Sequence, residues 1–373
     1  MKVIPKYIPI LKAKKGELSA YEHLSQSIKN NTLPIFEMPT ENWEKTQKQR
    51  IDFVDSKVLQ INKTLDKNST SLISLDFSFW NYKDQLLENQ EHIFSYTFNQ
   101  LTDKGYTLIP VIGYDRWHNE SDRSYQANIK ALDFKEIPFF IIRLDGEALE
   151  HIHEPFFFEE QIEEILNGLK VTIDKCLFLI DHNNIFGKSP TQVTEEIIFQ
   201  IKLITELNPL SIAISSHSMP KSINKLVPNH DSSNLLFRTE EDIWKNTIKK
   251  LNNPHIIYSD YGIIANDGEE RTGGNNSTNN GKIRYTTQDH LFVVRGHPFG
   301  KDGGKHVQMH DLAKKVVESN YFENMSWGDS KILECSQTHK APGSPMNWIS
   351  YELNHHVTYM LEEVITPLTV KFA

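Results

Sequence analysis

Cysteine, positive charge and long apolar runs are all scarce in this sequence. Two cysteines among 373 residues cannot form a disulfide framework. The formal net charge of -9 argues against non-specific wrapping of nucleic acid, because that binding depends on neutralising phosphates with lysine and arginine. Apolar runs such as 139–144 and 176–180 are too short to cross a bilayer, and the N-terminus lacks the apolar core of a signal peptide. We therefore expect a cytoplasmic protein with no membrane segment.

Familiar catalytic motifs are absent as well. The sequence contains no GxGxxG fingerprint, no HExxH pair, no serine nucleophile elbow and no two CxxC motifs, so several common enzyme classes lose support. Hydrophobic residues make up 38% of the chain and charged residues 24%, which is typical of a folded protein with a large core and an ordinary surface. The sequence therefore says more about architecture than about a reaction.

Short apolar segments recur along the chain with a spacing that fits one strand plus one helix. They are 33–36, 72–75, 108–112, 139–144, 176–180, 210–214, 255–258 and 291–294, with starts roughly 30 to 45 residues apart. Residues 160–173 and 193–207 between them have apolar side chains at helical spacing. Alternating strands and helices favour a parallel sheet, so we predict an α/β fold, a (β/α)8 TIM-like barrel with an elaborated C-terminal segment. An open doubly wound α/β sheet is the alternative.

A ninth strand-like run, 7–11, leaves one point of the topology open. Either this run plugs the floor of the barrel, or one of the later segments lies outside it. We expect residues 1–306 to form the barrel with an N-terminal strand and helix extension, and 307–373 to form the last barrel helix and a packing or interaction segment of the same structural domain. The Gly- and Asn-rich stretch 266–281 is predicted to be a loop after a strand end.

Polar residues follow most of the predicted strands, where a β/α barrel carries its chemistry. The candidate ligand-binding residues are Glu37, Asp76, Asp145, Asp260 and Tyr261. Among the carboxylates, Asp76, Asp145 and Asp181 are candidate ligands of a divalent metal, which would lower the pKa of a bound water and polarise a substrate oxygen. The plainer interpretation is that polar residues stand at strand ends because loops begin there.

Two histidines and two arginines complete the candidate catalytic set. His182 and His217 follow successive strands and would act as acid and base on a phosphodiester, beside Asp181. Arg143 and Arg295 would stabilise the negative charge that develops. A histidine at a strand end more often makes a structural hydrogen bond, so both interpretations stay open.

Several short motifs, taken in order, resemble one known family. They are YIPILKAK at 7–14, Gly16-Glu17, LPIFE at 33–37, Asp260-Tyr261-Gly262, Tyr285-Thr286, Arg295-Gly296, Trp327-Gly328-Asp329, Trp348 and Asn354-His355-His356. This pattern is similar to the beta protein family, which is named after a phage protein and is spread among bacteria. Gln308-Met309 departs from it, because an aromatic residue is expected after the glutamine. The resemblance implies a role in conflict between phage and bacterium, and it brings no catalytic residues with it.

Two functions of different classes follow from these observations. The first is a hydrolase or phosphodiesterase, assisted by a divalent metal, acting on a nucleotide, a nucleic acid or another phosphate-containing ligand in anti-phage defence. The second is a non-catalytic sensor or scaffold that binds a phage protein or a partner protein of a defence system. Whether the protein is an enzyme, and its oligomeric state, stay open at this point.

Overall fold

Eight parallel strands close into a barrel. The computed structural model describes residues 4–46, 48–65, 72–121, 123–134, 136–264, 279–302, 306–337 and 341–368. Around the barrel each strand pairs with the next, and the last pairs with the first. In that order the strands are β1 (Tyr7–Lys12), β2 (Ile35–Glu37), β3 (Ile73–Asp76), β4 (Leu108–Gly113), β5 (Phe140–Leu144), β6 (Cys176–Asn184), β7 (Ser211–His217) and β9 (Ile257–Asp260). The prediction of a (β/α)8 barrel is confirmed.

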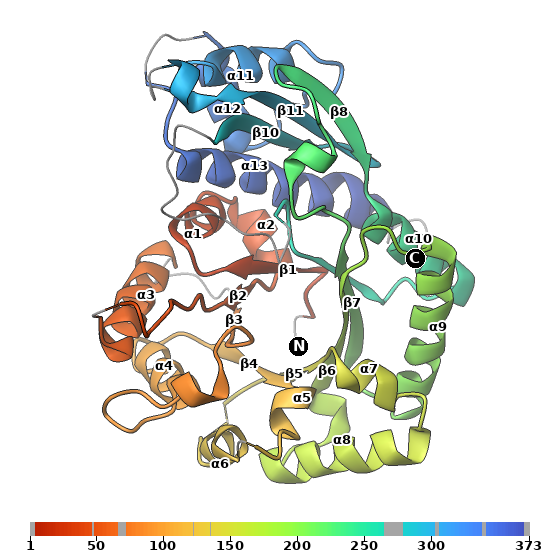
Figure 1. Ribbon diagram of the computed structural model, residues 1–373. Helices are drawn as coiled ribbons and strands as arrows, with labels where there is room; N and C mark the ends of the chain where they lie inside the picture. Colours follow the sequence, from red (N-terminus) through yellow and green to blue (C-terminus); the bar gives the residue numbers. More distant parts are fainter. Residues whose placement is uncertain are drawn as a thin grey trace.

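Helices surround this barrel and cover the outer faces of its strands (Figure 1). They are α1 (Lys15–Glu22), α2 (Gln26–Asn31), α3 (Arg50–Thr64), α4 (Ile93–Thr102), α5 (Tyr114–Trp117), α6 (Ser124–Lys130), α7 (Glu147–His151), α8 (Pro155–Leu169), α9 (Pro190–Glu206) and α10 (Thr239–Leu251). No helix in these described ranges is long and apolar enough to span a bilayer.

Local sequence explains where the longer helices begin and end. The Ser189 hydroxyl accepts a hydrogen bond from the Gln192 amide at the start of α9, and Pro190 takes the first helical position, where its missing N–H costs nothing. Helix α8 likewise begins with Pro155 and ends where Lys170 adopts a left-handed conformation. The buried stripe of α9, including Ile197, then packs on the barrel.

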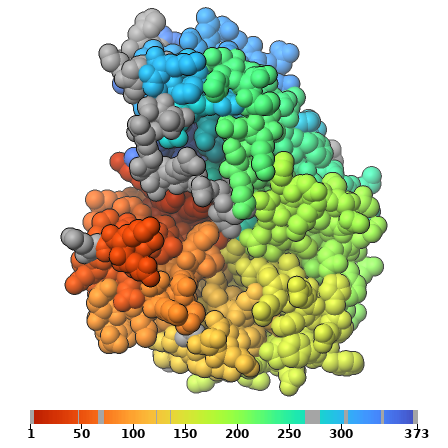
Figure 2. All heavy atoms as spheres, viewed as in Figure 1, coloured from red at the N-terminus to blue at the C-terminus, as the bar shows by residue number. Residues whose placement is uncertain are grey.

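A second layer is appended to one side of the barrel, and Figure 2 shows it as a separate lobe. Its antiparallel sheet has the order β10–β11–β8, with β8 at Ser232–Phe237, β10 at Asn280–Thr286 and β11 at His290–Pro298. Helices α11 (Met309–Val317), α12 (Trp327–Gln337) and α13 (Pro345–Tyr359) pack with this sheet around their own apolar core, and a π-helical turn, Met360–Ile365, follows α13. Helix α13 lies between the sheet and the barrel (Figure 1).

This layer corrects one of the predicted strands. Residues 291–294 were expected to form the eighth barrel strand, but they lie in β11, whose neighbours are β10 and β8. The run at 7–11 takes the vacant place as β1, between β2 and β9. The predicted division at residue 306 falls between β11 and α11, which share one core. Most of the predicted loop, 266–278, lies outside the described residues.

Alternation along the barrel strands determines which side chains reach the mouth. Apolar side chains inside the barrel form one cluster, which includes Ile8, Ile35, Ile141 and Leu179. Their neighbours one position along each strand face the helices instead. Each strand therefore sends every second residue inward, and the last inward residue before the loop lies at the mouth.

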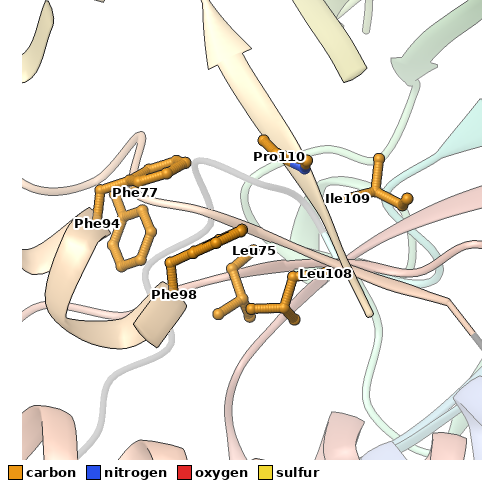
Figure 3. A pocket seen from close by; sticks show the side chains of 7 residues that line it. All are labelled: Leu75, Phe77, Phe94, Phe98, Leu108, Ile109 and Pro110. Atoms are coloured by element: carbon orange, nitrogen blue, oxygen red, sulfur yellow. The ribbon is translucent and has the colours of Figure 1, made fainter. Parts of the chain in front are cut away.

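A small pocket lies between β3, β4 and α4, away from the mouth (Figure 3). Its lining is apolar and comprises Leu75, Phe77, Phe94, Phe98, Leu108, Ile109 and Pro110. Such a lining offers no group for acid–base or charge chemistry, so the mouth is the better place to look for function.

Candidate functional site

Seven of the eight barrel strands place a polar side chain in one layer at the carboxyl end of the barrel, and β4 places Gly113 there. The side chains at these positions point into the barrel, as do those of the apolar cluster one layer below them. From β1 to β9 they are Lys12, Glu37, Asp76, Gly113, Arg143, Asp181, His217 and Tyr261, the last directly after its strand. Seven of the ten predicted site residues lie in or beside this layer: Glu37, Asp76, Arg143, Asp181, His217 and Tyr261 in it, and Asp145 beside it.

Arg143 is the centre of the layer and is almost completely buried. Its Nη1 donates to Glu37 Oε1 at 3.0 Å and to Asp76 Oδ2 at 2.5 Å. Its Nε donates to Asp181 Oδ2 at 2.9 Å, and its Nη2 donates to the Tyr261 hydroxyl at 2.7 Å. One guanidinium thus joins side chains from four other strands, a role that its planar fork of donors suits well.

Asp76 has a second cation beside it. Arg116 Nη2 lies 2.6 Å from Asp76 Oδ1, while its guanidinium stacks over the Tyr125 ring. Room for Arg116 comes from Gly113, since a Cβ there would lie 2.5 Å from the guanidinium. Burial opposes ionisation of Asp76, but Arg116 and Arg143 outweigh it and lower the pKa of this carboxyl.

The Tyr261 hydroxyl links Arg143 to the other wall of the mouth. It lies 2.6 Å from Asp181 Oδ2 and 3.0 Å from Asn183 Oδ1, and one proton serves these two acceptors. The His217 ring packs edge-on against the Tyr261 ring at 5.2 Å. Burial raises the pKa of Tyr261 well above its usual value, so this hydroxyl keeps its proton.

The mouth has one more carboxyl group than cations. The cations are Lys12, Arg116 and Arg143, and the carboxyl groups are Glu37, Asp76, Asp145 and Asp181. Burial raises the pKa of Glu37, the neighbouring Asp76 and Asp181 add to this effect, and Arg143 opposes it. Asp145 lies at the rim with its side chain 25% exposed, 3.5 Å from Arg143 Nε, and burial raises its pKa too. Glu37 and Asp145 are therefore the carboxyl groups of this set whose raised pKa values suit the transfer of a proton.

The three carboxylates predicted to bind a metal form ion pairs with arginine side chains. Within the described residues, no group of three or more His, Cys, Asp or Glu side chains is arranged to hold a metal ion. Asp76 contacts both arginines, and Asp181 and Asp145 contact Arg143. The charges of these carboxylates are thus balanced by guanidinium groups, which occupy the place that a cation would take.

Three predicted site residues lie away from the mouth. His182 faces outward, where its Nε2 lies 2.9 Å from Gln200 Oε1 on α9, so the structure does not bring it together with His217. Asp260 also faces outward, because the neighbouring Tyr261 takes the inward direction. Arg295 lies on β11 and donates to the carbonyls of Val227 and Pro228 in the connection before β8.

Asp260 belongs instead to a buried joint between the barrel and the appended layer. Tyr7 donates to its Oδ1 at 2.6 Å, and His356 of α13 reaches its Oδ2 at 3.0 Å. Burial lowers the pKa of His356, which fits a neutral ring that donates through Nε2 and accepts from the Thr286 hydroxyl at Nδ1. Burial opposes ionisation of Asp260, but His356, Arg238 and the Tyr7 hydrogen bond outweigh it and lower the pKa of this carboxyl. Strand β9 thus contacts both the mouth and the appended layer.

A second part of the joint explains the WGD and NHH motifs as a packing unit. Asp329 lies 3.0 Å from His355 Nδ1, and the other ring nitrogen reaches the Thr286 carbonyl at 2.9 Å. Both ring nitrogens of His355 therefore face acceptors, the Asp329 carboxylate on one side and the Thr286 carbonyl on the other. The Gly328 amide donates to Asn354 Oδ1, and a Cβ at Gly328 would collide with the Tyr351 carbonyl.

Sequence reasoning missed Lys12, Arg116 and Asn183 as residues of the mouth. Lys12 ends β1, a run whose place in the barrel was open, and its Nζ lies 5.8 Å from the centre of the Phe79 ring. Arg116 reaches the mouth from α5 only because Gly113 leaves room. Asn183 directly follows the Asp181-His182 pair. The expectation that site residues of a β/α barrel lie at the ends of its strands could therefore have identified it.

Comparison with known proteins gives a family. No curated protein matches the chain. A GH18 chitinase from Pseudoalteromonas aurantia is similar in structure, with a TM-score of 0.35 and 10% identity, over 57% of this chain and 93% of the chitinase. A likeness this weak carries no argument about fold or chemistry. The family model described as Beta protein, in contrast, matches residues 7–362, which is nearly the whole chain. The chain therefore belongs to the Beta protein family.

Proposed function

We propose that the protein is a hydrolase that uses general acid–base catalysis at the mouth of the barrel, with Glu37 as the proton donor. The observation that carries the proposal is the buried carboxyl group of Glu37, whose pKa is raised in a layer with one carboxyl more than cations. A catalytic acid needs a pKa shifted toward the working pH, and burial beside other carboxylates is the usual way to achieve it.

The hydrogen bonds of Glu37 suit this role. Ser78 donates to Oε1 at 3.1 Å and Arg143 donates to the same oxygen at 3.0 Å. The second oxygen, Oε2, is then the place for a proton that passes to a leaving group. Asp145 at the rim, with a raised pKa and an exposed edge, would take the proton from the attacking water.

The remaining residues of the layer position these two groups. Arg143 fixes the Glu37 carboxyl, while Asp181 and Tyr261 fix Arg143 from the other side. Each is buried and satisfied, so the arrangement is rigid before any ligand binds. They are positioning residues, and their loss would misplace the acid rather than remove it.

The substrate that fits best is a small molecule with an anionic group, such as a nucleotide. Lys12 and Arg116 supply cationic groups at the mouth with fewer carboxylate contacts than Arg143, which lies within ion-pair distance of four carboxylates. A nucleic-acid polymer fits less well, because the stretch after β5 carries eight acidic residues without one lysine or arginine between Leu144 and Leu169. A role in anti-phage defence remains the biological setting that the family resemblance suggests.

A metal-assisted mechanism has less support than the metal-free one. The three predicted metal ligands already contact guanidinium groups, so a divalent ion would have to displace Arg143 or Arg116. Melting temperatures with and without divalent ions distinguish the two forms, because a ligand that binds only the folded state raises the melting temperature.

The test compares Glu37→Gln with the wild type on a panel of nucleotides and nucleotide conjugates, with product formation as the readout. Gln keeps the shape and an acceptor for Arg143 but has no acidic proton, so we expect turnover to fall by about a hundredfold or more. The loss of activity on the alkaline side of the pH profile, which ionisation of Glu37 causes in the wild type, should disappear. Glu352→Gln is the matched control, since Glu352 is also buried and bonded to an arginine, Arg284, but lies on α13. Equal activity in Glu37→Gln and the wild type would overturn the proposal.

The sensor or scaffold function is the second candidate, and the buried joint favours it. Tyr261 and Asp260 are consecutive, so a ligand that moves β9 at the mouth also moves the partner of His356 in the appended layer. This function predicts a ligand that raises the melting temperature of both the wild type and Glu37→Gln without being consumed. Turnover of the same ligand by the wild type would decide for the hydrolase.

A further inference from the structure

A second surface, separate from the mouth, exposes aromatic side chains on the outside of the barrel. Phe156, in the first turn of α8, is 88% exposed, and Phe157 beside it is 38% exposed. Phe199 on the neighbouring helix α9 is 40% exposed. Phe158, by contrast, is buried and stacks on Tyr114, and Ile162, Ile165 and Leu169 continue the buried face of the helix.

These aromatic residues form one patch. His153, in the connection between α7 and α8, stacks on the Phe199 ring at 4.9 Å, and His151 packs edge-on against Phe157 at the same distance. His151, the last residue of α7, and His153 are two residues apart, so they link Phe157 on α8 to Phe199 on α9. We name Phe156, Phe157 and Phe199 the aromatic patch. Helix α8 lies on the side of the barrel opposite the appended layer (Figure 1), and the described residues leave the three rings of the patch exposed.

The surroundings of the aromatic patch are strongly acidic. Between Leu144 and Leu169 the chain has eight Asp and Glu residues and no Lys or Arg, against a formal net charge of -9 for all 373 residues. Glu159, Glu160 and Glu163 on α8 are exposed, and no ion pair joins them to another described residue. A surface helix can stay solvated without so many negative charges in one place. Unpaired charges around exposed aromatic rings are typical of the rim of a binding site.

We infer that the aromatic patch and its acidic rim are a docking surface for a partner protein that presents a lysine- and arginine-rich segment with an apolar anchor. The negative charge of the rim determines which kind of partner can bind. Nucleic acid and an anionic membrane would both be repelled by the glutamates, whereas a basic segment gains steering from them and contact area from the rings. Exposed aromatic side chains near the centre of a patch are the usual anchors of such interfaces.

The docking surface is joined to the mouth through one short helix. Helix α7 leaves β5 just after Asp145, and its Glu147 and Ala148 amides donate to Asp115 at 3.0 Å. Burial and the nearby Asp145 raise the pKa of Asp115 to about 6. A partner on α8 would therefore sit beside the rim of the mouth, although the surface does not depend on any reaction there.

The experiment uses the full chain and a fluorescent synthetic peptide in which lysine and leucine recur at helical spacing, with anisotropy as the readout. We expect saturable binding that weakens as salt is raised, because the glutamates are exposed. Phe156→Ser should weaken binding by about tenfold, as should a charge reversal of Glu159, Glu160 and Glu163 to Lys. The matched controls are Leu59→Ser, an exposed apolar residue on α3, and Glu22→Lys, an exposed acid on α1; both should bind as the wild type does.

Three results would overturn the inference. The first is no binding, and the second is binding that Phe156→Ser and Leu59→Ser reduce equally, which would make the contact non-specific. The third is concentration-dependent self-association in sedimentation that Phe156→Ser abolishes, since the occupant would then be a second copy of this chain. All the variants replace exposed side chains, and circular dichroism checks that they are folded.

Discussion

Replacement of Arg143 by methionine is the sharpest test of the charge arrangement in the mouth. Methionine fills similar space but donates no hydrogen bond, so Glu37, Asp76 and Asp181 lose a shared cation at once. Asp76 keeps Arg116 and the Phe77 amide. Asp181 keeps two bonds, from Tyr261 and the Asn183 amide, whereas Glu37 keeps one, from Ser78. Most of the loss of stability should therefore come from Glu37, the carboxyl group that keeps the fewest hydrogen bonds.

The expected size follows from known costs of buried charges. Removing one partner of a buried ion pair destabilises a protein by about 3–5 kcal/mol. In the variant the carboxyl pKa values rise above their unfolded values, so the folded state holds extra protons and its stability falls as pH rises. Each proton changes the free energy of unfolding by about 1.4 kcal/mol per pH unit. The loss in free energy of unfolding relative to the wild type should thus reach its full size in mild base and be smaller in mild acid.

Urea denaturation at about pH 5 and about pH 8, followed by tryptophan fluorescence, measures this difference. Arg284→Met is the control, because Arg284 is buried and bonded to a single carboxylate, Glu352, so its pH dependence should be shallower. A loss below about 1 kcal/mol at the higher pH, or the same loss at both, would refute the reasoning.

Three further outcomes are expected. Gly113→Ala should displace the Arg116 guanidinium, which is the flexible end of a side chain, and so weaken ligand binding about tenfold in titration while stability changes by less than about 1 kcal/mol. His355→Gln should cost about 3 kcal/mol by urea denaturation near neutral pH, with a smaller cost in acid, because the lowered pKa of Asp329 makes the pair stabilising only while that carboxyl is ionised. Glu37→Gln should melt progressively higher relative to the wild type as pH rises, since the raised pKa of Glu37 makes its ionisation destabilising and Gln does not ionise.

Most of the barrel could be predicted because its strands are short apolar runs at a regular spacing. The error concerned the last strand. The stretch 291–294 is as apolar as a barrel strand, because β11 is buried in the core of the appended layer. Composition alone cannot distinguish a strand that pairs in parallel from one that pairs in antiparallel, since the pairing partner lies elsewhere in the chain. The place of β1 depended on the same missing information.

The direction of side chains at the strand ends was harder to predict than their position. A strand buried on both faces has no alternation of apolar and polar residues from which to read the inward phase. Asp260 and Tyr261 were therefore both assigned to the mouth, although adjacent residues must face opposite ways. His182 was assigned to the mouth for the same reason, although it is adjacent to the inward-facing Asp181 and faces outward. Arg116 could not have been found, because it enters from a helix through the space at Gly113.

The order of the strands has a consequence for how the chain is made. β8 is synthesised between β7 and β9, but it pairs with β11, which comes after the barrel is complete. On the ribosome the barrel can therefore close while β8 still has an unpaired edge, and exposed edges of this kind invite association with other chains. For the same reason no single cut separates the barrel from the appended layer. Expression of either part alone should require a circular permutation or a linker that replaces residues 218–238.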